Sequence, residues 1–247
     1  MDKPETQIGG GARAFPSTSW SVVARLRDRA SEERPRLLQR LIADYWKPVY
    51  CLVRHSYAKT NEDAKDLTQE FFLLEVVEGA LLDHFDPDRG NFRAFLKGAV
   101  ANFMRRTTRD AGRQKRGGGV RPLSLELQAP DLAEIVPDGR ALTPEQLFDR
   151  AWKRVVLARA VRLLEQRLRA RGQEACYEVF RRYELEPEGP DVSYRSVGKA
   201  LDLTPDTVKN HLTRARDEFT HAVSSVVAEY VGAEADLSAE LDDLFKC

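Results

Sequence analysis

The spacing of apolar residues limits what this chain can fold into. They recur every three or four positions, as on one face of a helix, and the alternating runs of β-branched residues that strands need are missing. Leu, Ala, Arg and Glu dominate, and all four are good helix formers. The sequence therefore predicts an all-α protein.

Local signals divide this pattern into individual helices. Thr60 and Thr143 have the position and chemistry of N-caps, and Pro144 suits a first helical turn. Residues 83–91 (DHFDPDRGN) are typical of a turn. The predicted helices cover residues 36–55, 61–78, 92–109, 144–170, 172–184, 194–201 and 205–230.

The long gap between the third and fourth predicted helices contains GRQKRGGG and several prolines, which indicates a flexible basic linker. We therefore predict two helical domains. Leu237, Leu241 and Leu244 line one side of an acidic tail, which is either frayed or covers a basic surface of its own chain. The predicted units are a disordered N-terminus (1–19), a first domain (20–110), the linker (111–142), a second domain (143–231) and the tail (232–247).

The chain is neutral overall, with 39 basic and 39 acidic side chains, but its charge is strongly polarised. Residues 61–88 carry a net charge of −8 and residues 89–121 a net charge of +9. Neighbouring segments are thus suited to partners of opposite charge.

Several classes of protein are not favoured by the sequence. The N-terminal residues do not resemble a signal peptide and no apolar run is long enough to span a bilayer, so a cytoplasmic protein without membrane contact is expected. Cys51, Cys176 and Cys247 lie too far apart for a disulfide framework or a zinc knuckle, and neither a metal nor a cofactor is expected. No phosphate-binding loop or nucleophile elbow is recognisable, so the protein is not expected to be an enzyme.

Residues 193–219 have the pattern of a helix-turn-helix. A short apolar helix face precedes a turn at 202–204, and a second helix repeats its apolar residues at helical spacing. Its outer face offers donors for phosphates and base edges, although a solvated helical hairpin would show the same pattern. The candidate DNA contacts are Thr204, Thr207, Lys209, Asn210, Thr213, Arg214 and Arg216.

The helix predicted at 92–109 separates an apolar half from a cationic half, as expected of a helix that follows a nucleic-acid backbone. The preceding helix has the opposite character, because Asp63, Asp66 and Glu70 form an acidic stripe that suits a basic protein partner. Together they indicate an adaptor between a protein and a nucleic acid.

The segments EDAKDLTQEFF (62–72) and DPDRGNFRAFLKGAVANFMRR (86–106), followed by the helix-turn-helix, resemble the extracytoplasmic-function sigma factors of bacterial RNA polymerase. The resemblance covers about 36–109 and 144–230. It implies that the first domain corresponds to sigma region two, which binds the polymerase clamp and melts and reads the minus-ten element. The second would correspond to region four, which reads the minus-thirty-five element, and the polymerase would supply all catalysis.

By this resemblance, the core-polymerase contacts are Asp63, Asp66, Gln69 and Glu70, whereas Lys65 stands where the family usually has an acid. Phe92 and Phe95 are interpreted either as a pocket for a flipped base or as ordinary core residues. The candidate minus-ten contacts are Asn91, Phe92, Phe95, Lys97, Asn102, Arg105, Arg106 and Arg109.

Two further hypotheses concern regulation and class. A phosphate on Thr60 or Thr68 would restore the negative charge that Lys65 removes, so a Ser/Thr kinase joins an anti-sigma factor among the candidate partners beside core polymerase and promoter DNA. The alternative is that Thr60 only caps a helix and Thr68 is a partly packed polar residue. The alternative function is a two-domain DNA-binding regulator that does not contact polymerase.

Overall fold

The computed structural model describes residues 21–86, 89, 91–111, 142–189, 191–230 and 234–245. These residues form helices and no strand, which confirms the predicted all-α class. The predicted N-terminal segment, nearly all of the predicted linker and Cys247 lie outside the described residues.

The described residues of the first half of the chain include four α-helices. They are α1 (Ser21–Arg27), α2 (Arg34–Ser56), α3 (Asn61–Phe71) and α4 (Phe92–Ala111). After α3 the backbone continues as a short π-helix, η1 (Phe72–Val77), and then as a 3₁₀-helix, η2 (Leu81–His84). Helix α1 was not predicted, because seven residues are too few to show a helical period.

The second half contains two long helices and several short ones. Its elements are α6 (Pro144–Ala170), α7 (Glu174–Phe180), the π-helix η5 (Arg181–Leu185), α8 (Tyr194–Leu201), α9 (Pro205–Val227), the 3₁₀-helix η6 (Ala228–Tyr230) and α10 (Glu234–Phe245).

The predicted helix starts are confirmed by their caps. The Thr60 hydroxyl accepts a hydrogen bond from the Asp63 amide at 3.1 Å, which satisfies one of the unpaired donors of α3. At the start of α6, Thr143 and Gln146 form a reciprocal capping box, with bonds of 3.2 and 2.8 Å.

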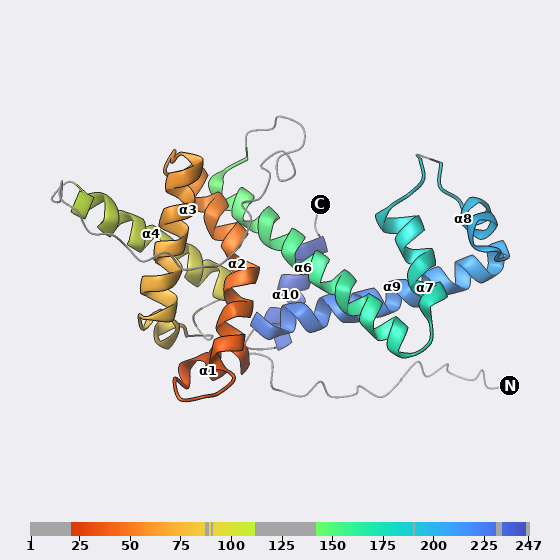
Figure 1. Ribbon diagram of the computed structural model, residues 1–247, viewed down its shortest axis with the longest axis horizontal. Helices are drawn as coiled ribbons and strands as arrows, with labels where there is room; N and C mark the ends of the chain where they lie inside the picture. Colours follow the sequence, from red (N-terminus) through yellow and green to blue (C-terminus); the bar gives the residue numbers. More distant parts are fainter. Residues whose placement is uncertain are drawn as a thin grey trace, which may run out of the picture.

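The two long helices connect the ends of the molecule (Figure 1). Helices α1 to α4 lie at one end and α7 and α8 at the other, while α6 and α9 pack together between them. Helix α2 packs against α6, and α10 packs against α9.

Two apolar cores share these long helices. The first unites α2, α3 and α4 with Leu147 to Ala160 of α6 and with the C-terminal part of α9. The second contains Leu164 and Leu168 of α6, α7, and the α8–α9 pair. The cores therefore meet within α6, and the predicted boundary at 142/143 does not separate them.

Candidate nucleic-acid interface

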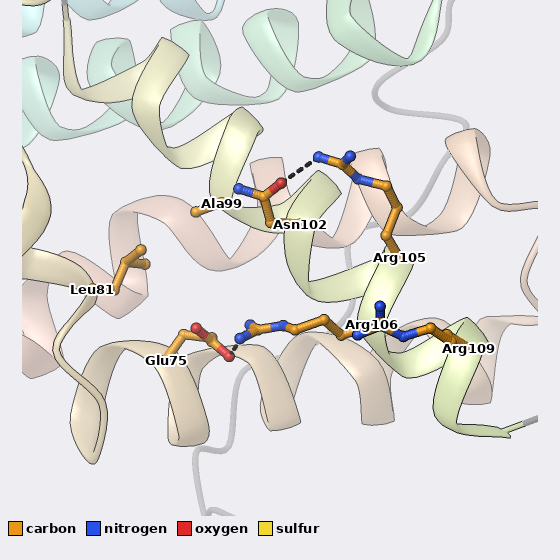
Figure 2. Close-up of a pocket in the computed structure, with 7 residues that line it drawn as sticks. All are labelled: Glu75, Leu81, Ala99, Asn102, Arg105, Arg106 and Arg109. Atoms are coloured by element: carbon orange, nitrogen blue, oxygen red, sulfur yellow. Dashed lines mark hydrogen bonds and ion pairs between the residues drawn. The ribbon is translucent and has the colours of Figure 1, made fainter. Parts of the chain in front are cut away.

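A cationic groove lies along the C-terminal half of α4 (Figure 2). A cleft of about 450 Å³ is lined by Glu75 of η1 and by four exposed residues of α4, which are Asn102, Arg105, Arg106 and Arg109. Helical spacing brings these side chains to one side, because positions three and four apart are neighbours on a helix. Four of the predicted minus-ten contacts thus lie together.

The groove keeps an excess of positive charge. Arg106 forms an ion pair of 2.5 Å with Glu75, and the Asn102 side chain accepts a hydrogen bond from Arg105 (Figure 2). The lining residues thus include three guanidinium groups and one carboxylate. An exposed pair of this kind contributes little to stability, so Arg106 can exchange Glu75 for a phosphate at small cost.

A second hollow lies at the start of α4. It has a volume of about 380 Å³ and is lined by His84, Phe85, Asp86, Arg89, Asn91, Ala94 and Phe95. Phe95 is half-buried, with its ring centroid 5.2 Å from that of Phe85. Asn91 caps α4 by accepting a hydrogen bond of 2.8 Å from the Ala94 amide.

Phe92 does not belong to this hollow. It is only 1% exposed and packs edge-on against Tyr45 and Phe85, at 5.3 and 5.2 Å between ring centroids. Its ring is surrounded by protein and cannot stack on a base in this structure. The structure thus places Phe92 in the first core.

Lys97 is also not where the prediction placed it. Its ammonium group lies 2.7 Å from Asp149 of α6 and 5.1 Å from the Phe148 ring centre. The predicted cationic face of α4 spans half the helix circumference, and α6 packs against the edge that carries Lys97. Lys97 therefore faces protein, whereas Arg105, Arg106 and Arg109 remain exposed.

Arg93 is a residue that sequence reasoning missed. It is 8% exposed, and its guanidinium lies 2.5 Å from Glu240, 3.1 Å from Asp243 and 3.3 Å from Asp149. It also stacks 4.2 Å from the Trp152 ring centre. Burial alone would lower the pKa of Arg93, but the surrounding carboxylates raise it above its usual value. No local pattern marks this residue, because its partners come from α6 and α10.

Helix α3 presents the predicted acidic surface. Asp63 and Asp66 are exposed, whereas Gln69 and Glu70 are half-buried. Burial raises the pKa of the Glu70 carboxyl above its usual value. Lys65 pairs with Glu62 at 3.2 Å, so its positive charge is partly compensated within the same helix.

The two candidate phosphorylation sites differ in exposure. Thr60 is exposed at the helix start, although its hydroxyl serves as the N-cap. Thr68 is fully buried and donates a hydrogen bond of 2.6 Å to the Ala64 carbonyl. A kinase cannot reach Thr68 unless α3 opens, so this structure argues against Thr68 as a modification site.

Helices α8 and α9 are joined by the tight turn that the sequence predicts. Asp202 ends α8 in the left-handed conformation, with φ 55°, which Asp tolerates better than most residues. The Leu203 amide then donates a bond of 2.8 Å to the Gly198 carbonyl. A Cβ at Gly198 would lie 2.5 Å from the Leu203 carbonyl oxygen, so the close approach of the turn requires glycine there.

The outer face of α9 carries the predicted recognition residues. Thr204 caps the helix through the Thr207 amide at 3.2 Å, and Thr207 is half-buried. Arg216 is committed to Glu184 of η5 at 2.5 Å and lies over the Tyr183 ring. Like Thr204 and Arg216, the side chains of Lys209, Asn210, Thr213 and Arg214 are exposed.

Comparisons with known proteins do not assign the chain to a family. No protein-family model matches it, and a search of curated proteins finds no match either. Among the described residues, no group of three metal-ligating side chains occurs. The described helices include none that is both long and apolar enough to cross a bilayer. The exposed cationic surfaces on α4 and α9 therefore carry the functional argument.

Proposed function

We propose that this protein is a sigma factor of the extracytoplasmic-function type, which binds core RNA polymerase and directs promoter recognition and melting. The observation that carries the proposal is the combination of the α4 groove with an exposed helix-turn-helix face on α9. One chain thus offers two separate cationic surfaces for nucleic acid.

The acidic surface of α3 supports a role beside a protein partner. Asp63 and Asp66 are exposed on α3, which continues into η1. Glu75 of η1 forms the ion pair with Arg106 of α4. A partner that docks on α3 is thereby placed next to the DNA-binding groove. Basic helices of the polymerase would complement this surface, because charge complementarity fixes orientation and accelerates encounter.

The two DNA surfaces divide the work. The helix-turn-helix suits duplex DNA, because its second helix fits the major groove. The α4 groove, with three arginines and the adjacent hollow beside Phe95, suits a phosphate backbone and an unstacked base. This division matches an upstream element that stays double-stranded and a minus-ten element that melts.

The test is reconstituted transcription from a promoter library with bacterial core RNA polymerase. We expect initiation at specific promoters only when this protein is added. The variant Asp66→Lys should lower polymerase affinity by about tenfold without unfolding the protein, because Asp66 is exposed and reversal places like charges against the partner.

A matched control is Glu32→Lys, which makes the same change of charge at an exposed position before α2. It should bind polymerase like the wild type. If both variants lose polymerase affinity equally, the loss reflects the overall charge of the protein and not a docking surface on α3. If the protein gives promoter footprints as strong without polymerase as with it, the protein is instead a DNA-binding regulator that does not contact polymerase.

A further inference from the structure

The start of α4 is covered by the C-terminal helix α10. Glu240 accepts a hydrogen bond of 2.6 Å from Asn91 and forms the ion pair with Arg93, which Asp243 completes from the next turn. Asn91 and Arg93 are about 150 residues away from these carboxylates in the sequence. We call this cluster, made of Asn91, Arg93, Glu240 and Asp243, the α10 clasp.

Among its described side chains, three leucines anchor α10 to the first core. Leu244 is 7% exposed, and Leu237 and Leu241 are half-buried against the first core. The helix has 12 residues, a length at which an isolated helix is marginal in water. Helix α10 therefore depends on its docking contacts, which combine these leucines with the ionic contacts of the α10 clasp.

Charge determines what the surface under α10 would attract. In the closed arrangement Arg93 and Lys97 face the carboxylates of Asp149, Glu240 and Asp243. Lys153 also donates a hydrogen bond to the Asp243 carbonyl. The carboxylates thus occupy the places beside Arg93 and Lys97 that a phosphate would take. If α10 departs, Glu240 and Asp243 leave with it, and Arg93 and Lys97 keep Asp149 from this set of carboxylates.

We propose that Arg93 is a further contact for the nucleic-acid backbone and that α10 occupies its place in the unbound protein as an intramolecular acidic competitor. The inference rests on the proposed function, because it takes α4 as the DNA-binding helix. The clasp adjoins the hollow beside Phe95, since Asn91 belongs to both. Opening it would expose Arg93 at the N-terminal end of α4, on a different side of the helix from the groove residues.

The ionic part of the clasp suits a contact that opens. Burial raises the pKa of the Glu240 carboxyl above its usual value, against the opposing effect of Arg93. The desolvation of Glu240 is therefore not fully offset by its partner. A polyanion whose phosphates bind Arg93 therefore competes with the ion pair between Arg93 and Glu240, in which the desolvation of Glu240 is only partly offset.

The experiment releases α10 without changing charge. In the full-length protein, Leu241→Ser with Leu244→Ser removes two apolar anchors, and Leu185→Ser is the control at an exposed leucine of η5. Binding of a fluorescent single-stranded DNA is measured by anisotropy over a range of salt concentrations, without polymerase. The α10 variant should bind about tenfold more tightly at low salt, with a slope of log affinity against log salt steeper by about one to two.

Arg93→Gln tests whether the gain comes from the proposed contact. Added to the α10 variant, it should abolish most of the increase, because the released surface then lacks the proposed contact. A gain that persists without Arg93 would overturn its assignment as a backbone contact.

Hydrogen exchange of the wild-type protein keeps the test independent of whether the variants fold. Amides of α10 should lose protection when the polymerase complex binds promoter DNA, while those in the middle of α9 should not. Retained protection of α10 in a complex that transcribes would overturn the clasp and leave the sigma function intact. Failure of the proposed function would show instead as absence of polymerase-dependent transcription by the wild type.

Discussion

At the residue scale, the side chains of the candidate interface differ in whether they already have a partner. Arg214 is exposed on α9, whereas Arg216, two residues later, is held by Glu184 and the Tyr183 ring. The sequence analysis predicts the same role for both arginines. It could not distinguish them, because the partner of Arg216, Glu184, belongs to a separate element, η5. A prior partner reduces the net charge that an arginine offers to a phosphate.

Arg214→Ala is therefore expected to weaken binding to duplex DNA across sequences and to lower the salt slope by about one, as for one lost phosphate contact. Arg216→Ala should lower the slope by clearly less, because Glu184 already neutralises Arg216. The measurement is affinity against salt concentration for both variants. Glu184→Gln is the companion variant, and it should strengthen binding by releasing Arg216. Equal slopes for the two alanine variants would contradict this difference.

At the element scale, the turn of the helix-turn-helix depends on Gly198. Gly198→Ala brings a methyl group to 2.5 Å from the Leu203 carbonyl oxygen, a backbone atom that cannot move aside without displacing the turn. We expect a loss of roughly 1–3 kcal/mol in the free energy of unfolding. Chemical denaturation measures this loss. The control is Ala200→Ser, at an exposed position of α8. Gly189 is not used as a control site, because its backbone φ of 94° would strain any side chain. A Gly198 variant as stable as that control would show that the turn relaxes.

Most elements could be predicted from the sequence because their causes are local. Helix α6 begins and ends at the predicted residues, since its capping box and apolar period both lie within the segment. Helices α3 and α7 end earlier than predicted and continue as π-helices, which periodicity does not distinguish from α-helix. In the candidate site, the exposed groove residues follow from spacing on one helix, whereas the places of Lys97 and Arg93 depend on α6 and α10.

At the scale of the whole molecule, the question is whether the two cores behave as separate domains. Helices α6 and α9 run without interruption through both cores, and Phe219 packs against each of them. A buried ionic network crosses the first core, since Arg159 of α6 lies 2.5 Å from Asp44 of α2 and 2.9 Å from Glu229 of η6. Shared helices favour cooperative opening, because neither core can lose them alone.

Asp44→Asn tests this coupling. Asp44 is 6% exposed, and removal of its charge leaves Arg159 with Glu229 as the remaining ion-pair partner among these residues, which should cost about 2 kcal/mol. Fluorescence of Trp46 and Trp152 follows the first core, and amide hydrogen exchange in α7 and α8 follows the second. We expect the variant to lower the midpoint of the fluorescence transition and to accelerate exchange in α7 and α8 as well, with Asp217→Asn, at an exposed position of α9, as the control. If exchange in α7 and α8 stays at the wild-type rate, the cores unfold independently. The predicted division into two domains would then describe the folding units, despite the helices that the two cores share.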